Sequence, residues 1–350
     1  MKKSPILSWM LILCMIGSFL LCTGCAGNTA HRVDDGVLRI VTTIFPPYDF
    51  AREITGGKAE LHMLLKPGTE SHSYEPSPAD ILLVESCDLF IYNGGESDTW
   101  VEDLLATIDT SHLQVLKMMD CVDMLEEEAV EGMQAVHSHN HGEECTDEHH
   151  HHEDEETHDE EHRHGEEEEF HPEVAEYDEH VWTSPVNAMK ITAAIAATVA
   201  EIDNENAEFY RANAENYQAR LGQLHQEFQR IVAEGKRDTF IFGDRFPFRY
   251  FAEEYGLTYR AAFPGCSAES EPGAKTVAYL IDKVRQEKIP NIFYIEFSNQ
   301  KIALTIQEET GAKPLMFHSC HNLSADEMAQ GITYLMLMEQ NAENLKEALN

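Results

Sequence analysis

The chain has 350 residues, of which 43% are hydrophobic, and a formal net charge of −38 at pH 7. This length and apolar content suffice for two ordinary domains with a tail and a linker. Binding to phosphate backbones requires clustered lysine and arginine. Such an acidic chain is therefore a poor partner for nucleic acid and a better one for multivalent cations.

The first residues are typical of a secretion signal. Lysines at positions 2 and 3 precede an apolar run over residues 7–21, and a glycine stands directly before Cys25. This arrangement resembles the bacterial lipobox, in which such a cysteine is lipidated. We expect residues 1–24 to be a lipoprotein signal peptide and residues 25–36 to be a flexible tether on the outer face of the cytoplasmic membrane. An ordinary signal peptide or a short membrane anchor is the alternative, although the apolar run is short for a membrane span.

Strands and helices alternate through the first lobe, residues 37–125. Runs of β-branched residues are followed by segments with proline near a helix start, and glycines end the strands. Such alternation predicts parallel strands joined by right-handed crossovers. The expected strands are residues 38–45, 60–65, 88–92 and 114–117, and the expected helices are residues 46–54, 77–86 and 98–108.

Histidine and acid dominate residues 137–171, which hold eleven of the 19 histidines and fifteen acidic side chains. Few of these side chains can enter a core, so we expect a disordered, solvated loop over residues 126–171. Imidazole and carboxylate are ligands for divalent metals, which favours metal contact over a plain acidic spacer. The expected auxiliary metal contacts are His137, His139, His141, His149, His150, His151, His152, His158, His162, His164 and His171.

A long helical tract follows, with residues 172–204 containing a second candidate metal motif and a helix over 187–202. Residues 205–235 then form the expected linking helix, about 45 Å long. Apolar residues recur along it with helical periodicity. These are Phe209, Ala212, Tyr217, Leu221, Leu224 and Phe228.

Residues 236–350 return to alternation and predict a second α/β lobe. The fold class is therefore α/β, with two lobes containing parallel sheets joined by a long rigid helix, and ligands are expected in the cleft at the carboxyl ends of the strands. The expected strands are residues 239–242, 257–262, 291–295 and 314–317, and the expected helices are residues 247–255, 273–286, 299–310 and one from residue 325.

Three histidines are placed at expected strand ends or next to the helical tract. His72 follows a strand in a loop rich in proline and glycine, His180 directly precedes the tract, and His318 follows the last strand. A lone loop histidine is seldom a ligand, but three at the ligand edge of two facing lobes predict a metal site.

The loops around these histidines resemble the zinc- and manganese-specific solute-binding lipoproteins of ABC importers, the ZnuA/AdcA-like group, over residues 37–345. GTESHSYEPSPAD, residues 68–80, resembles the family motif Gly-x-x-x-His-x-Tyr-Glu-Pro-x-Pro-x-Asp, and DEHVWTSPVNA, residues 178–188, resembles Asp-x-His-x-Trp-x-x-Pro. The histidine-rich insertion ahead of the second motif is typical of zinc members. The resemblance implies that His72 and His180 are metal ligands.

The C-terminal half departs from the family pattern. A family ligand lies in a His-Asp-x-Phe-x-Tyr-Phe context, and here Gly243 stands where that histidine is expected, with extra residues before Tyr250. His318 replaces the usual final aspartate and is our third ligand. The fourth position stays open, with water as a further possibility. Its candidates are Asp244, Glu296 and His321.

Five cysteines remain beyond the lipobox. A disulfide between Cys266 and Cys320 is the simpler expectation outside the cytoplasm, and a thiolate ligand at Cys320 is the alternative. The odd count implies at least one free thiol, and we expect Cys87 and Cys121, which lie in apolar surroundings, to be buried.

These features predict a monomeric extracytoplasmic receptor that binds Zn²⁺ and delivers it to an ABC permease. Three candidate histidines favour zinc over Mn²⁺, which is the alternative metal in the same family. A zinc hydrolase is disfavoured because the sequence lacks HExxH, GxSxG and P-loop motifs. A surface zinc buffer, acting through the histidine-rich run alone, is the remaining alternative.

Overall fold

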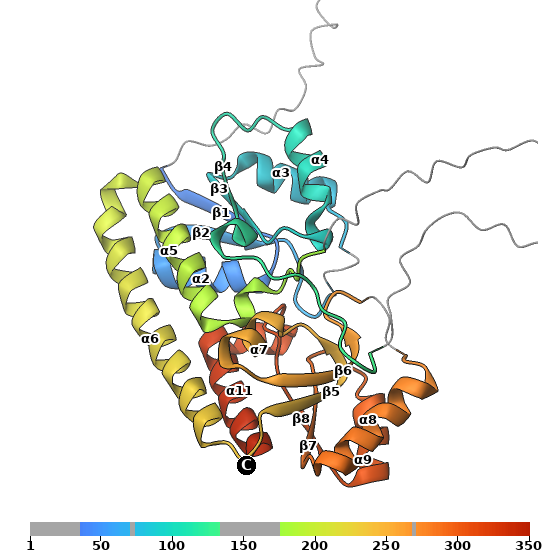
Figure 1. Ribbon diagram of the computed structural model, residues 1–350. Helices are drawn as coiled ribbons and strands as arrows, with labels where there is room; N and C mark the ends of the chain where they lie inside the picture. Colours follow the sequence, from blue (N-terminus) through green and yellow to red (C-terminus); the bar gives the residue numbers. More distant parts are fainter. Residues whose placement is uncertain (1–35, 71–73, 134–175, 268–270) are drawn as a thin grey trace, which may run out of the picture.

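The computed structural model describes residues 36–70, 74–133, 176–267 and 271–350 (Figure 1). The expected signal peptide, Cys25, His72 and the histidine-rich run 137–171 lie outside these residues. The predicted α/β class is confirmed, because the strands of the described chain form two four-stranded sheets, one in each lobe, and all strand pairs within them are parallel.

The N-terminal lobe contains a sheet in the order β2-β1-β3-β4. Its helices begin with favourable signals, since α3 has a Ser77 capping box and α2 and α3 both have proline in the first turn. The elements are β1 (Leu38–Thr42), α2 (Phe45–Thr55), β2 (Ala59–Met63), α3 (Pro78–Ser86), β3 (Leu89–Tyr92), η1 (Glu96–Asp98), α4 (Trp100–Thr107), β4 (Gln114–Lys117) and η2 (Met118–Cys121).

The C-terminal lobe repeats this topology, because its order β6-β5-β7-β8 is the same permutation of four successive strands. No repeat between the two lobes is visible in the sequence. Its elements are β5 (Thr239–Phe246), α7 (Arg249–Tyr255), β6 (Thr258–Pro264), α8 (Ala274–Glu287), β7 (Asn291–Tyr294), α9 (Lys301–Thr310), β8 (Lys313–Met316), α10 (Ala325–Gln330) and α11 (Tyr334–Leu349).

One hydrophobic core runs through both lobes. It includes Ile40 of β1, Leu221 of α6 and Phe240 of β5, while smaller clusters lie under α3 and α4 in one lobe and under α8 and α9 in the other. Each sheet is therefore the middle layer of three. The apolar core on the face toward the long helices is shared by the two lobes. A continuous core opposes a wide hinge motion between the lobes.

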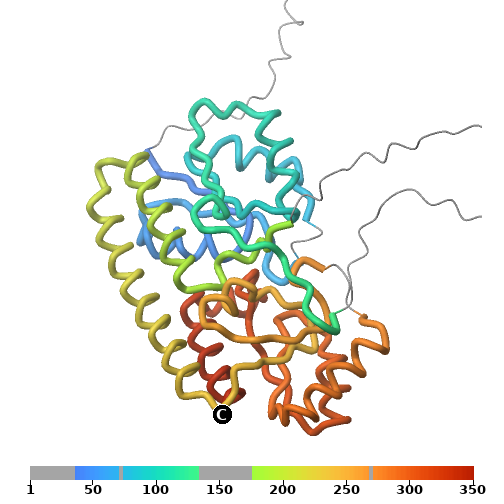
Figure 2. Tube along the Cα trace, viewed as in Figure 1, coloured from blue at the N-terminus to red at the C-terminus, as the bar shows by residue number. Residues whose placement is uncertain are grey.

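Helix α6 (Ala207–Glu234) runs along the side of both lobes, about 42 Å, after α5 (Pro185–Ile202) and a short turn, η4 (Asn204–Asn206) (Figures 1 and 2). It packs against α2, α5 and α11. Within the described ranges, no helix has both the length and the apolar character needed to cross a bilayer.

The buried stripe of α6 differs in part from the sequence prediction. Phe209 is 39% exposed and lies next to Gly56 at the end of α2, and Ala212 is also exposed. Tyr210 and Ala214 are buried in their place. The predicted periodicity was right from Tyr217 onward, but its first turns were assigned to the neighbouring face.

Residues 126–133 also differ from expectation, because they are not part of a disordered loop. This segment crosses to the C-terminal lobe, where Glu128 pairs with Arg249 at 3.3 Å and Glu131 accepts a hydrogen bond from the Tyr279 hydroxyl at 3.1 Å. An isolated bridge joins Glu126 to Tyr177 on the far side of the histidine-rich run. Both flanks of that run are thus held against the folded lobes.

Replacing Leu221 by alanine tests the shared core. Because Leu221 is fully buried, we expect the change to lower the free energy of unfolding by about 2–5 kcal/mol. The same substitution at Leu304 of α9, which is 44% exposed, should change it by less than about 0.5 kcal/mol. Denaturant unfolding of both variants makes the comparison, and equal losses would contradict the described core.

Candidate functional site

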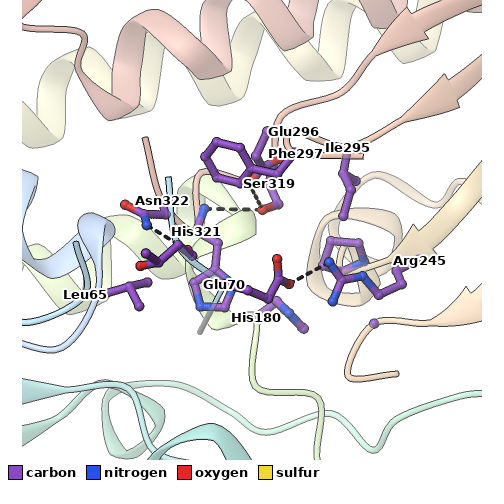
Figure 3. Close-up of a pocket in the computed structure, with 13 residues that line it drawn as sticks. Leu65, Glu70, His180, Arg245, Ile295, Glu296, Phe297, Ser319, His321 and Asn322 are labelled. Carbon is purple, nitrogen blue, oxygen red and sulfur yellow. Dashed lines mark hydrogen bonds and ion pairs between the residues drawn. The ribbon is translucent and has the colours of Figure 1, made fainter. Parts of the chain in front are cut away.

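A small cavity lies between the lobes at the carboxyl ends of their strands (Figure 3). Its volume of about 20 Å³ suits one ion or one water molecule. Both lobes contribute to its lining, as expected for a ligand site in sheets of this topology. The lining residues are Leu65, Thr69, Glu70, His180, Arg245, Pro247, Gly265, Ile295, Glu296, Phe297, Ser319, His321 and Asn322.

His180 lies in the cavity wall just before the turn η3 (Val181–Thr183), and only 1% of it is exposed. Asp178 accepts hydrogen bonds from the His180 backbone N–H at 2.8 Å and from its ring Nδ1 at 3.2 Å. This pairing favours the tautomer with the proton on Nδ1, in which Nε2 carries the lone pair that a metal ion requires. Gly265 makes room for the ring, because a Cβ there would lie 3.1 Å from the His180 Cε1.

Acidic neighbours set the electrostatics around His180. Burial lowers its pKa, but the carboxylates of Asp178, Glu179 and Glu127 outweigh that effect and raise the pKa above the ordinary value. The same negative field attracts any cation that enters the cavity.

His321 completes a histidine pair across the cavity. It follows β8, and its ring centroid lies 5.8 Å from that of His180 and 5.0 Å from that of Trp182. Its backbone is fixed from both lobes, since its carbonyl accepts the Phe45 N–H at 3.3 Å and its N–H donates to the Ser319 hydroxyl at 3.2 Å. The structure thus joins His180 to the histidine that the sequence ranked below His318.

His318 is not part of the cavity lining, although its ring Nδ1 lies 3.6 Å from the Glu296 carboxylate. It is 2% exposed, and its Nδ1 accepts the backbone N–H of Cys320 at 2.9 Å. Asn341 of α11 fixes the His318 backbone through its N–H at 2.7 Å and its carbonyl at 2.8 Å. Because Cys320 has a positive φ of 62°, the chain reverses here, so the imidazoles of residues 318 and 321 serve different environments.

Arg245 lies in the part of the cavity where the family resemblance implies a histidine ligand that this sequence lacks. Gly243 packs against α9, and a Cβ there would lie 2.8 Å from the Ala303 nitrogen. A register shift in β5 between Phe242 and Arg245 accommodates one extra residue, as in a β-bulge, and Arg245 lines the cavity.

The alignment chosen for the family motif explains why the sequence analysis missed Arg245. If Phe248, Tyr250 and Phe251 are aligned with the Phe, Tyr and Phe of the family motif, Arg245 stands at its histidine and no residue is inserted. This second register agrees with the place of Arg245 in the cavity lining.

Two carboxylates approach the cavity, and each has partners. Glu296, after β7, accepts hydrogen bonds from the Ser319 backbone N–H at 2.7 Å and from the Ser319 hydroxyl. Glu70 accepts one from Arg245 at 2.6 Å (Figure 3). Asp244, the other carboxylate predicted from the sequence, is not among the cavity residues.

The loop that leads to Glu70 is held by the opposite lobe. The Asn322 side-chain amide donates to the carbonyls of Lys66 at 2.8 Å and Thr69 at 2.9 Å, and the Gly68 N–H donates to the Leu323 carbonyl at 2.7 Å. The positive φ of 79° at Gly68 suits glycine in this turn. The chain just before His72 is therefore fixed at the cavity.

A second small cavity shares His321 and adds to the negative field. Asp98 and Glu179 line it and are almost fully buried. Burial raises the pKa of Asp98 to about 6, although the backbone N–H groups of Gly94 and Asn93 stabilise its charged form. This cavity backs the histidine pair with carboxylates that favour a nearby cation.

The predicted disulfide between Cys266 and Cys320 is not formed, and both are free thiols. Cys320 is buried in the shared core, whereas Cys266 lines a separate cavity beside Met119 and Glu127. Burial raises the pKa of both thiols. Cys320 is not among the residues that line the cavity between the lobes, so the thiolate alternative at Cys320 is not supported either.

Among the predicted ligands, His180, His321 and Glu296 line the cavity, whereas His318 and Asp244 do not. In the described parts of the chain, no three His, Cys, Asp or Glu side chains form a group that could hold a metal ion. His180 and His321 therefore need a further ligand, and His72 lies outside the described residues.

Replacing Trp182 by phenylalanine tests how the His321 loop is held. The Trp182 indole N–H donates to the buried Ser319 carbonyl at 2.8 Å, so its loss should lower the free energy of unfolding by about 1–3 kcal/mol. Trp100 offers a matched control, because its buried indole N–H has no hydrogen-bond partner. Denaturant unfolding should show a clearly larger loss at position 182, and a larger loss at position 100 would contradict this assignment.

Sequence comparisons assign the chain to a known group. The family described as zinc-uptake complex component A, periplasmic, matches residues 40–348. The zinc-binding lipoprotein AdcA of Streptococcus pneumoniae is 31% identical over 334 residues, which cover 94% of this chain and 60% of AdcA. The chain thus spans well under the full length of that relative. The high-affinity zinc uptake protein ZnuA of Bacillus subtilis is 29% identical, with 97% of this chain and 98% of the relative covered.

Solved structures agree with the sequence comparison. The Zn(II)-bound ZnuA-like domain of S. pneumoniae AdcA has a TM-score of 0.67 at 27% identity, covering 90% of this chain and 99% of that domain. The metal-dependent lipoprotein YcdH of B. subtilis has a TM-score of 0.68 at 27% identity, covering 89% and 99%. With matching sequence and matching two-lobe fold, this chain belongs to the ZnuA family of zinc-uptake complex components.

Proposed function

We propose that this protein binds Zn²⁺ in the cavity between its lobes and delivers it to the membrane permease of an ABC importer. The observation that carries the proposal is the pairing of His180 and His321, from opposite lobes, around a cavity that suits one ion. The relatives described as zinc-binding and zinc-uptake proteins support zinc as the cargo.

The proposed ligand set is His72, His180 and His321. The residues that flank His72 support its place, because Glu70 and Tyr74 line the two cavities that share His321. Three neutral imidazoles with water in the fourth position form a tetrahedral site suited to zinc. Glu296 is the alternative fourth ligand, although it would have to exchange its hydrogen bonds with Ser319.

The surrounding fold supports a receptor with little domain motion. The shared core and α6 oppose wide opening, so metal exchange is assigned to the loops around residues 66–72 and 318–322. The histidine-rich run 137–171 is assigned to weak metal capture that supplies this fixed site. Its flanks at residues 126–133 are held near the cleft.

We further propose that the protein is a non-enzymatic, monomeric receptor anchored through lipidated Cys25 on the outer face of the cytoplasmic membrane. The lipoproteins among its relatives and its own lipobox support the anchor. Its net charge of −38 makes nucleic acid an unsuitable partner.

Alanine substitution of His321 and of His318 separates the two candidate ligands. Loss of His321 removes a metal ligand, so zinc affinity of the tight site should fall by roughly 100-fold or more, whereas loss of His318 should cost less than about tenfold. Competition of the full-length variants against a zinc chelator measures both.

The comparison also separates a receptor from a buffer, because both variants keep all eleven histidines of residues 137–171. A receptor loses its tight site in the His321 variant alone and retains only weak binding. If both variants bound zinc as the unaltered protein does, the proposed site would be wrong. If the His318 variant showed the larger loss, His318 would be the ligand.

A further inference from the structure

An arginine lies in a cavity that is otherwise suited to a cation. Arg245 comes from the end of β5, and its guanidinium contacts the Glu70 carboxylate of the opposite lobe at 2.6 Å (Figure 3). A second, longer hydrogen bond at 3.4 Å joins the guanidinium to the Ser267 carbonyl. Both charged side chains line the cavity with His180 and His321.

The two carboxylates at this cavity are held in different ways. Glu296 is fixed within its own lobe by the backbone N–H and hydroxyl of Ser319. Glu70 is 42% exposed, and its contact with Arg245 crosses the cleft. Among the described residues, Arg245 is the charged partner that sets the direction of the Glu70 carboxylate.

Arginine is well suited to this task. Its guanidinium stays protonated at every physiological pH and binds carboxylates through fixed N–H donors, but it has no lone pair for a metal. A carboxylate that is paired with it has less negative charge to offer a metal ion. The pair is neutral as a whole, which leaves the imidazoles of the cavity as its strongest metal ligands.

We propose that Arg245 determines metal specificity by holding the Glu70 carboxylate away from the bound ion. Carboxylate oxygen suits Mn²⁺, whereas imidazole suits Zn²⁺, so withdrawal of Glu70 favours zinc. This inference rests on the proposed zinc-receptor function and deepens it. Arg245 acts through Glu70 and is a positioning residue.

Three full-length variants test this inference: Arg245→Gln, Glu70→Gln and the double substitution. The dissociation constants for Zn²⁺ and Mn²⁺ are measured by competition with a chelator of known affinity. The Arg245→Gln variant frees Glu70 and should shift the affinity ratio toward Mn²⁺ by about tenfold. Glu70→Gln and the double variant should keep the ratio of the unaltered protein, because both lack the carboxylate.

Two controls separate this role from a structural one. Arg245→Lys keeps a cation beside Glu70 and should retain the original ratio. Arg230→Gln removes an arginine from a surface pair with Glu227 on α6 and should leave both affinities unchanged.

Three results would overturn the inference. If Arg245 only helped to close the cleft, Arg245→Gln and Glu70→Gln would weaken both metals alike, and the inference would be overturned. An unchanged ratio in Arg245→Gln, with tight zinc binding intact, would overturn it too. Absence of tight zinc binding in the unaltered protein would instead overturn the proposed function itself, and this inference with it.

Discussion

The hydrogen bond from the Trp182 indole to the Ser319 carbonyl joins the two halves of the candidate site. Trp182 lies two residues after His180, and Ser319 lies two residues before His321. The Trp182 carbonyl in turn accepts the Tyr334 hydroxyl at 2.6 Å, which ties the same segment to α11. The Trp182 ring lies 5.4 Å from that of His180 and 5.0 Å from that of His321. One buried residue therefore fixes the spacing of both imidazoles.

The charges around these residues fit the cation site that we propose. Asp178 orients His180, while Asp98 and Glu179 lie behind His321, so carboxylates surround the imidazoles that we propose as ligands. Such outer carboxylates raise the basicity of histidine ligands. Arg245 neutralises Glu70 at the same cavity, which fits a site where nitrogen donors dominate.

The sequence was sufficient to predict the layers of the fold. Alternating strands and helices, glycines at strand ends and the long periodic helix gave the two parallel sheets and α6, because these features depend on local propensity and burial. His180 was also predictable, since it directly precedes a proline-initiated helix. The buried face of α6 at Phe209 was assigned wrongly, because exposed aromatic residues are common on protein surfaces and periodicity alone does not identify them.

The missing parts of the site depend on backbone geometry that has no simple sequence pattern. Cys320, between His318 and His321, has a positive φ that is unusual for a residue other than glycine, and the two histidines have different surroundings. Arg245 follows an irregularity in β5, and local propensity does not reveal where the extra residue of this strand is accommodated. Cys266 and Cys320 share a lobe but belong to different environments, which spacing along the chain does not show.

The most direct test of this account is anomalous diffraction at the zinc absorption edge from crystals loaded with one equivalent of zinc. We expect one strong peak in the cavity between the lobes, about 2.0–2.1 Å from imidazole nitrogens of His180 and His321. A third imidazole, from His72, should complete the protein ligands. A peak beside His318, or a principal peak bound only by residues 137–171, would contradict it.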